Sequence, residues 1–212
     1  MTFFDVIYNG VNKDYFQAIS ELESLKISEK FKLPENFLLA VGHFEKRKNY
    51  LNLIEALSRL HKLGQLETLV IIGNDSGELK AVKERIDALN MSNHVYIFNG
   101  LSDLEVRYFY RSCKLFIFPS LYEGFGIPIL EAMATNCSIV LSDIPVFREI
   151  TQNKGAYFLH NDPNSIAQAI IDVLNSNSEQ ERLIEYGKKR VEEFNFKKMA
   201  FYLAYIYKSL KN

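Results

Sequence analysis

Two glutamates, Glu123 and Glu131, flank a glycine pair and a proline in the segment YEGFGIPILEAMA. Pro128 suits the first turn of a helix, because the N–H that proline lacks is not needed there, and good helix formers follow it. The sequence therefore predicts Glu123 in a loop and Glu131 in the first turns of a helix. Two acids on either side of a glycine-rich turn indicate a binding site.

The turn between these acids suits an anionic ligand. Gly124 and Gly126 let a ligand approach the backbone closely, and a helix start presents free N–H groups and a partial positive charge that suit a phosphate. A glutamate that faced the phosphate would repel it, so each acid is expected to point at a neutral group such as a hydroxyl. A diphosphate between two sugars offers hydroxyls on both sides, so the pattern predicts a nucleotide-sugar site.

Two cations are candidates for contacting the diphosphate. Arg47 and Lys48 follow the first apolar run, in VGHFEKRKNY. Arginine binds phosphate oxygens with a planar fork and lysine acts as a mobile point charge, so either would stabilise a departing diphosphate without a metal. A solvated, charged turn is the alternative, but the position between a strand and a helix that begins at Asn49 favours a site.

Six short apolar runs, separated by amphipathic segments, must position these residues. The runs are typical of buried parallel strands and lie at residues 37–42, 68–73, 95–100, 114–120, 137–143 and 156–159. The alternation of strand and helix predicts an α/β fold, a Rossmann-like doubly wound parallel sheet with helices on both faces. Ligands of such sheets bind at the carboxyl ends of the strands, so the cationic turn and the glycine-rich turn should meet at one rim.

Local signals mark the ends of two of the helices. Asn49 is expected to cap the helix between the first two strands, and Gly64 is expected to end it. The sequence SDLE at residues 102–105 is a capping-box pattern that predicts the start of another helix.

The chain is expected to form one body in three parts. Residues 1–36 would supply a strand leading into the domain, a turn and a surface helix, residues 37–193 the nucleotide-sugar-binding domain, and residues 194–212 a C-terminal helix packing on the domain. The last helix has its apolar residues on one face: Phe196, Met199, Ala200, Leu203, Ile206, Tyr207 and Leu210.

The composition argues against several classes of protein. With 25 Lys and Arg against 26 Asp and Glu, the formal net charge of −1 gives no basic surplus for nucleic acid. Cys113, Cys137 and the four histidines show no metal-ligand spacing, so no metal site is expected. The absence of a secretory pattern and of a long apolar run leads us to expect a cytoplasmic protein.

Four segments, in this order, resemble the retaining glycosyltransferases of group 1, which form family four and have the GT-B architecture. They are VIYNGVNKDYF, VGHFEKRKN, LFIFPSLYEGFGIPILEAMA with its two glutamates separated by seven residues, and FNFKKMAFYLAYIYKSL. A lone glutamate pair would be weak evidence, whereas four ordered matches cover nearly the whole chain. The resemblance implies the donor-binding C-terminal half of a GT-B enzyme.

The resemblance implies roles for individual residues. The glutamate that matches Glu131 holds the ribose hydroxyls of the donor, and the one that matches Glu123 faces the transferred sugar near its reacting carbon. Arg47 and Lys48 match the cationic pair on the diphosphate, so Glu123, Arg47 and Lys48 are the candidate catalytic residues. The other positions implied in donor binding are Gly42 beside the diphosphate, Gly100 and Leu101 at the base, and Gly124, Phe125, Gly126 and Ile127 around the sugar and phosphates.

Some positions depart from the family pattern. His43 stands where many members carry arginine or threonine, and both a phosphate contact and a histidine bonded to backbone are compatible with it. Asn136 and Ser138 replace a common glycine and a common proline, which should alter only a turn. Glu149 matches a frequent family glutamate near the cleft, although a solvated charge at a helix end is an equal alternative.

The resemblance implies a transfer reaction that this chain cannot complete alone. The full enzyme would move a hexose from a nucleotide diphosphate sugar, GDP-mannose or a UDP-sugar, to a glycan or lipid-linked acceptor, with retention and with neither metal nor cofactor. The KRKN turn weakly favours GDP-mannose. A peripheral association with a membrane would fit a lipid-linked acceptor.

The resemblance does not cover the N-terminal acceptor-binding domain of the family, so we expect these 212 residues to be inactive by themselves. It would be part of a longer enzyme, the favoured alternative, or a natural half-enzyme that docks on an acceptor subunit. Aromatic residues near the C-terminus would face the missing half or lie in the core: Phe194, Phe201, Tyr202 and Tyr205.

Two other functions stay open. A dehydrogenase would explain Gly124 and Gly126 after one strand and Asp143 after the next. Against it, Ile129 stands where a third glycine belongs, and Glu123 would crowd a pyrophosphate. A non-catalytic module that binds a nucleotide sugar would share the same acidic and cationic residues.

Overall fold

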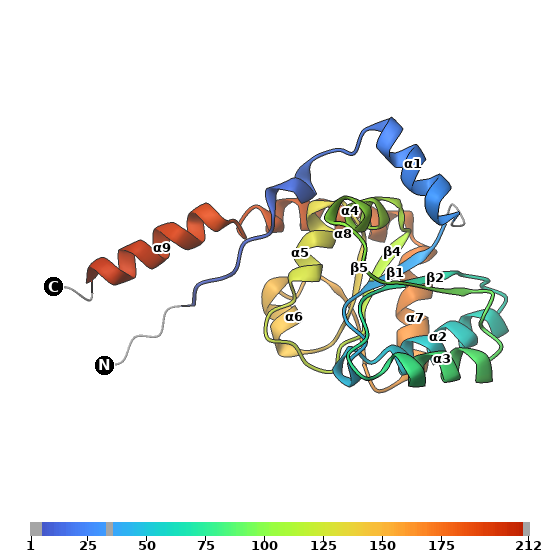
Figure 1. Cartoon of the computed structure of the whole chain (residues 1–212). Coiled ribbons are helices and arrows are strands. Elements are labelled where there is room, and N and C mark those ends of the chain that lie inside the picture. Colours follow the sequence, from blue (N-terminus) through green and yellow to red (C-terminus); the bar gives the residue numbers. More distant parts are fainter. Residues whose placement is uncertain (1–5, 33–35, 210–212) are drawn as a thin grey trace.

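A six-stranded parallel sheet forms the centre of the protein, which the computed structural model describes over residues 6–32 and 36–209. The strand order is β3-β2-β1-β4-β5-β6 (Figure 1). The strands are β1 Leu38–Val41, β2 Leu69–Ile72, β3 Val95–Phe98, β4 Leu115–Phe118, β5 Ile139–Ser142 and β6 Ala156–Phe158. Each lies within one of the six apolar runs, so the predicted doubly wound α/β sheet is confirmed.

Helices cover both faces of this sheet, and each face has its own core. One face carries α2 Tyr50–Lys62, α3 Leu79–Ala88 and α7 Pro163–Leu174, and the other carries α4 Asp103–Ser112, α5 Ile127–Ala134 and α6 Pro145–Ile150. Alternate residues of β1 enter the two cores, Leu38 and Ala40 the first and Leu39 the second. Burial on both faces explains why the strands are continuous apolar runs. The remaining long helix of the domain is α8 Asn177–Val191.

From β1 the chain continues to β2 and β3 at one edge of the sheet, and it then returns to β4, which lies on the other side of β1. Because β1 pairs with both β2 and β4, the connections that follow β1 and β4 diverge, which makes a topological switch point at their carboxyl ends. Parallel sheets of this kind bind ligands in the crevice at that point.

The expected helix ends are confirmed for α2 and α4, but Asn49 acts differently. Gly64 ends α2 with φ +82, and the N–H groups of Gly64 and Gln65 bond to His61 O and Leu60 O, as in a Schellman motif. Ser102 forms the expected capping box with Glu105.

Asn49 precedes α2 with φ 59, and its side chain does not cap the helix. Its Nδ2 instead donates hydrogen bonds to Pro119 O at 3.0 Å and to His160 O at 2.7 Å. These carbonyls follow β4 and β6, so Asn49 fixes the turn before α2 to the carboxyl edge of the sheet.

The N-terminal part lacks the expected strand over its described residues. Residues 6–12 have no regular secondary structure, a short 3₁₀ helix η1 spans Lys13–Phe16, and the surface helix α1 spans Glu21–Phe31. These residues pair with no strand of the sheet; one backbone hydrogen bond, Val11 N–H to Phe194 O at 3.1 Å, joins them to the C-terminal part. Residues 1–5 of the expected strand lie outside the described part.

The last helix forms as expected but lies away from the sheet. Helix α9 spans Phe196–Ser209, and none of its residues is buried. It extends away from the sheet (Figure 1), and its residues Tyr202, Tyr205 and Ile206 line a pocket together with Val6 and Ile7 of the N-terminal segment. Phe194, just before it, is in the core, whereas Phe201, Tyr202 and Tyr205 are exposed. Leu210 lies outside the described residues. Among the described helices, none combines the length and apolarity needed to cross a bilayer.

Candidate functional site

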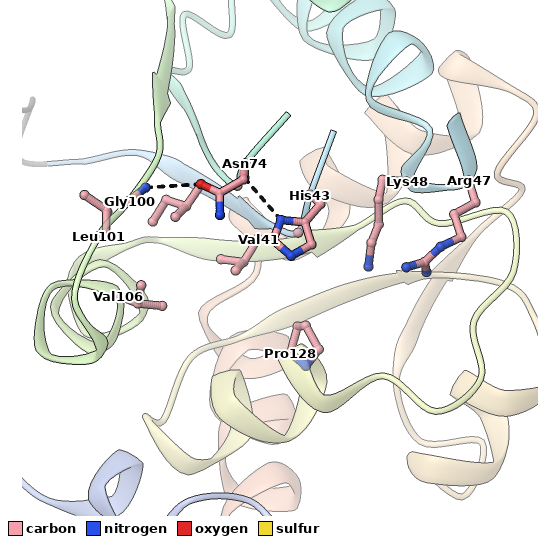
Figure 2. A pocket seen from close by; sticks show the side chains of 12 residues that line it. Val41, His43, Arg47, Lys48, Asn74, Gly100, Leu101, Val106 and Pro128 are labelled. Atoms are coloured by element: carbon pink, nitrogen blue, oxygen red, sulfur yellow. Dashed lines mark hydrogen bonds between the residues drawn. The ribbon is translucent and has the colours of Figure 1, made fainter. Parts of the chain in front are cut away.

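The carboxyl ends of β1, β2 and β3 and the start of α5 surround a cavity of about 350 Å³ (Figure 2). Five of the residues expected to contact the donor lie in its lining: Gly42, Arg47, Lys48, Gly100 and Leu101. The other lining residues are Val41, His43, Ile72, Gly73, Asn74, Val106 and Pro128. The cationic turn and the glycine-rich turn therefore meet at one rim.

Two glycines allow the ends of β1 and β2 to touch at this cavity. A Cβ on Gly73 would lie 1.9 Å from Gly42 O, so no side chain fits there. A Cβ on Gly42, where φ is +152, would lie 2.9 Å from Lys48 Cε. Gly42 thus leaves room for Lys48, and Gly73, which the sequence did not single out for the donor, is required by the close approach of two backbones.

The cationic turn is the 3₁₀ helix η2, Lys46–Lys48, and it holds the carboxylate of Glu123. Arg47 Nη1 lies 2.5 Å from Glu123 Oε2, and Lys48 Nζ lies 2.7 Å from Glu123 Oε1. Ser120 Oγ donates a further hydrogen bond to Glu123 Oε1 at 2.9 Å. In the ligand-free chain, Glu123 therefore points at two cations and not at a neutral group.

This ion cluster is largely removed from water. The side chain of Glu123 is 9% exposed and that of Lys48 is 7% exposed. Burial lowers the pKa of Lys48, and the hydrogen bond to Glu123 opposes this effect. The Lys48 ammonium also lies 4.6 Å from the centre of the Phe118 ring, a cation–π contact at the end of β4.

Arg47 has a second acidic partner. Its Nε donates to Glu45 Oε2 at 2.6 Å. Burial acts to lower the pKa of Arg47, but the hydrogen bond to Glu45 and the charge of Glu123 outweigh it, so the pKa lies above its ordinary value. Arg47 O also accepts from Leu121 N–H at 2.8 Å, which joins the cationic turn to the loop that carries Glu123.

Glu131 lies in a different environment and outside the lining of the cavity. Tyr110 donates a hydrogen bond to Glu131 Oε2 at 3.0 Å. Burial raises the pKa of Glu131, and the hydrogen bond from Tyr110 opposes the shift. The two glutamates of the motif are therefore separated by the start of α5, one among cations and one beside a tyrosine hydroxyl. The sequence gave no sign of Tyr110 as a partner.

The glycine-rich loop lies beside the cavity, and only Pro128 of this region lines it. Gly126 has φ +113 and precedes α5, so the left-handed conformation that favours glycine is required there. Gly124 has no neighbouring atom within 4 Å of its Cβ position, Phe125 is half-buried, and Ile127 is exposed. The backbone of this loop is thus accessible from solvent at Gly124.

His43 and Asn74 form a second polar group in the cavity, shown in Figure 2. The backbone N–H of Asn74 donates to His43 Nδ1 at 3.2 Å, and the Asn74 side-chain oxygen accepts from Gly100 N–H at 3.3 Å. His43 is exposed rather than partly buried, and it lines the cavity, so its bond to the backbone does not exclude a phosphate contact. The order Gly73, Asn74, Asp75 directly after β2 was the only sequence signal for Asn74.

The described residues contain no group of three or more His, Cys, Asp or Glu that could hold a metal ion. Cys113 and Cys137 are free thiols whose sulfur atoms lie 3.2 Å apart between α4 and β5, which their separation along the chain did not indicate. Burial raises the pKa of the Cys113 thiol, which makes it a poor nucleophile.

Residues 23–190 match the family described as glycosyl transferases group 1. The chain belongs to this family. It is 32% identical over 169 residues to the O-antigen chain mannosyltransferase RfbU of Salmonella typhimurium. The matched region covers 79% of this chain and 43% of RfbU. It is 34% identical over 156 residues to the serotype-specific mannosyltransferase WbdA of Escherichia coli, over 72% of this chain and 19% of WbdA. The chain therefore spans less than half of either relative.

Solved structures share the fold over almost the whole chain. A glycosyltransferase from Rickettsia africae has a TM-score of 0.84 at 27% identity, over 98% of this chain and 57% of that one. The C-terminal domain of the group 1 protein LpcC from Francisella tularensis has a TM-score of 0.71 at 22% identity, over 87% of this chain and 97% of that domain. Anabaena HepE in complex with UDP has a TM-score of 0.84 at 19% identity, over 97% of this chain and 57% of HepE.

Proposed function

We propose that this chain is the donor-binding part of a glycosyltransferase that moves a hexose from a nucleotide diphosphate sugar to a glycan acceptor. The observation that carries the proposal is that Arg47 and Lys48, which line a cavity of the Rossmann-like sheet, both contact Glu123. A diphosphate leaving group gains charge as the sugar departs, so two fixed cations at that place lower the barrier.

In the proposed reaction, the diphosphate replaces Glu123 as the partner of Arg47 Nη1 and Lys48 Nζ. Both donors already lie within 2.7 Å of a carboxylate oxygen, so phosphate oxygens can take the same positions. The released carboxylate then turns towards the transferred sugar. The anomeric carbon exchanges its bond to a diphosphate oxygen for a bond to an acceptor hydroxyl oxygen, the proton of that hydroxyl passes to the diphosphate, and the two cations stabilise the leaving diphosphate. Transfer with retention and without a divalent metal is part of this proposal.

The donor that we favour is GDP-mannose, with a UDP-sugar as the other candidate. RfbU and WbdA are mannosyltransferases, and HepE binds UDP. The main-chain groups of Gly100 and Leu101 at the apolar end of the cavity would contact the base, beside Val41, Ile72 and Val106. Glu131 would hold the ribose.

A second half of the enzyme would bind the acceptor, a glycan or a lipid-linked glycan. Helix α9 presents Phe201, Tyr202 and Tyr205 to solvent, and we propose that this face contacts the acceptor-binding half. The chain alone would then bind the donor without transferring the sugar. The complete enzyme would work in the cytoplasm, with peripheral association to a membrane where the acceptor is lipid-linked.

The test is selective binding by the 212-residue chain. GDP-mannose, UDP-glucose and NAD are titrated by calorimetry, and each is tested for a rise in melting temperature; saturation at 100 times Kd adds about 2.7 kcal/mol of stability. Arg47→Ala and Lys48→Ala should weaken the nucleotide sugar at least tenfold. Lys46→Ala is the matched control, because Lys46 is exposed in the same turn and does not line the cavity. Absence of binding by any nucleotide sugar at millimolar concentration would refute the proposal.

The second candidate function is a non-catalytic module that binds a nucleotide sugar in the same cavity. Arg47 and Lys48 in the cavity lining favour it, because binding alone needs the same cations as catalysis. A turnover assay of the protein completed with an acceptor-binding half separates the two. The enzyme requires that Glu123→Ala and Lys48→Ala lower turnover and that EDTA leave it intact. Turnover that is unaffected by both substitutions favours the module, and strict dependence on Mg²⁺ or Mn²⁺ contradicts the metal-free mechanism.

A further inference from the structure

Tyr8, in the segment before η1, packs against the glycine-rich loop. Its ring is stacked on the ring of Phe125 with 5.9 Å between centroids, and its hydroxyl donates a hydrogen bond to Glu149 Oε1 at 2.7 Å. Phe125 lies between Gly124 and Gly126, and Glu149 lies in α6. Tyr8 therefore connects the loop to a helix of the domain, and neither its sequence position nor the family motif had indicated this contact.

The two ends of the glycine-rich loop are held differently. At Gly126, the Cβ position is 3.1 Å from Phe147 Cε1 and 3.5 Å from Ile150 Cδ1, so this end packs directly on α6. At Gly124, no atom lies within 4 Å of the Cβ position. The conformation of the loop at Gly124 thus depends on what holds the side chain of Phe125.

Phe194 completes an aromatic cluster with Tyr8 and Phe125. Its ring centroid lies 5.4 Å from that of Tyr8 and 6.0 Å from that of Phe125. Phe194 is 1% exposed, and the guanidinium of Arg190 lies 4.5 Å from its ring centre. Of the three rings, Phe194 is therefore the fixed one, and Tyr8 is held on it.

The same cluster joins the two segments by which the chain leaves the domain. Val11 N–H bonds to Phe194 O, and a Cβ on Gly10 would lie 2.5 Å from Phe196 N, so the segment before η1 lies directly on the segment before α9. Both segments extend from the same side of the domain (Figure 1). A displacement of either one would reach Phe125 through Tyr8 or Phe194.

We propose that Tyr8 is a positioning residue for donor binding, which acts through Phe125 on residues 124–126 and couples this loop to the two segments that leave the domain. The inference rests on the proposed function, because it takes the loop to contact a nucleotide sugar. Tyr8 itself is not one of the residues that line the cavity.

The first experiment needs no ligand. Backbone ¹⁵N order parameters are measured for the free chain and for Tyr8→Leu, Tyr8→Phe and Tyr207→Leu. In Tyr8→Leu, the values at Gly124 and Phe125 should fall from about 0.85 to below about 0.6, while Gly126 stays rigid. Tyr8→Phe keeps the ring and should keep the rigid values. Tyr207 is an exposed ring on α9, so Tyr207→Leu controls for the loss of a surface aromatic. Unchanged values at Gly124 in Tyr8→Leu overturn the proposal.

The second experiment measures GDP-mannose binding by calorimetry for the same variants. Tyr8→Leu should raise Kd roughly threefold to tenfold, as expected for the loss of an aromatic contact, and Tyr8→Phe should restore affinity to within about twofold. Because Tyr8 acts through Phe125, Tyr8→Leu should add nothing in a Phe125→Leu background.

A lower melting temperature with an unchanged Kd, or additive effects in the double variant, would mean a purely structural role and overturn the proposal. If the unmodified chain binds no nucleotide sugar, the proposed function fails, and the order parameters still decide whether Tyr8 positions the loop.

Discussion

Replacing Glu123 by glutamine should tighten the binding of a free nucleoside diphosphate, although it removes a residue that the reaction needs. The carboxylate is in contact with both cations of the cavity, Arg47 Nη1 at 2.5 Å and Lys48 Nζ at 2.7 Å. A diphosphate that binds these cations must first displace it. Glutamine has nearly the same shape but no charge, so the variant lacks this internal competitor.

The size of the effect follows from the two contacts. A hydrogen bond to a charged group contributes about 1.5–3 kcal/mol, so two of them set an upper limit of about 3–6 kcal/mol. Two effects reduce the gain in binding free energy well below this upper limit. The carboxylate displaced in the unmodified chain forms new hydrogen bonds to water or sugar hydroxyls, and the amide of glutamine in the variant still accepts one weaker hydrogen bond from Lys48. We expect a net gain of about 1–2 kcal/mol, which is about fivefold to thirtyfold in Kd.

The assay is calorimetric titration of GDP and UDP into both proteins at two salt concentrations. Glu78→Gln is the control for the loss of one negative charge, because Glu78 lies nearby without contacting either cation, and its effect should be less than about twofold and should vanish at high salt. Glu45→Gln, which frees only Arg47 Nε, should give an intermediate gain. Weaker or unchanged binding by Glu123→Gln would refute the idea that the carboxylate occupies the diphosphate position.

Three further predictions concern stability. Gly73→Ala should prevent or severely weaken folding, because its Cβ would lie 1.9 Å from a backbone oxygen, whereas Gly124→Ala, in open space, should shift the urea midpoint little. Asn49→Ala should lower the free energy of unfolding in urea by about 2–3 kcal/mol, since it removes two hydrogen bonds to carbonyls at the sheet edge. Burial raises the pKa of Glu131 above its ordinary value of 4.5, so folding favours the protonated carboxyl group. The stability that this protonation adds is complete below pH 4.5 and is lost as the pH rises through the pKa of the folded state. The melting temperature of Glu131→Gln relative to that of the unmodified chain should therefore rise as the pH is raised above 4.5, and a difference that stays constant with pH would contradict this.

The strands of this protein were predictable because their signal is local. Each is a run of apolar residues bounded by glycine or polar residues, and burial on both faces of a parallel sheet requires such a run. The same signal failed before η1, where Val6, Ile7 and Tyr8 are apolar or aromatic but belong to no strand. In α9 the helical period indicates which face is apolar and says nothing of what covers that face, so the sequence could not show that no residue of this helix is buried.

The site was predictable in its position and less so in its contacts. The rule that ligands bind at the carboxyl ends of parallel strands placed the cationic turn and the glycine-rich turn together, although they lie 75 residues apart at Lys48 and Glu123. Arg47 and Lys48 form ion pairs with Glu123 in the folded, ligand-free chain. The residue types alone could not show that the acid of one turn would contact the cations of the other. Tyr8 and Tyr110 were missed because no local pattern relates them to the loop or the helix that they contact.

The spacing of the two glutamates is constrained by α5 as well as by chemistry. Ile127 begins this helix midway between them, and Glu131 follows it by four residues, about one turn, so Glu131 projects from the same side as the helix start. One inserted residue would rotate the carboxylate by about 100°, away from Tyr110 and into the position of Ala132, which is fully buried. An unpaired charge there would cost several kcal/mol. The number of residues between the two glutamates therefore sets the angle of Glu131 about the axis of α5. Glu123 contacts two cations before this helix, and Glu131, within the helix, lies beside Tyr110 of α4.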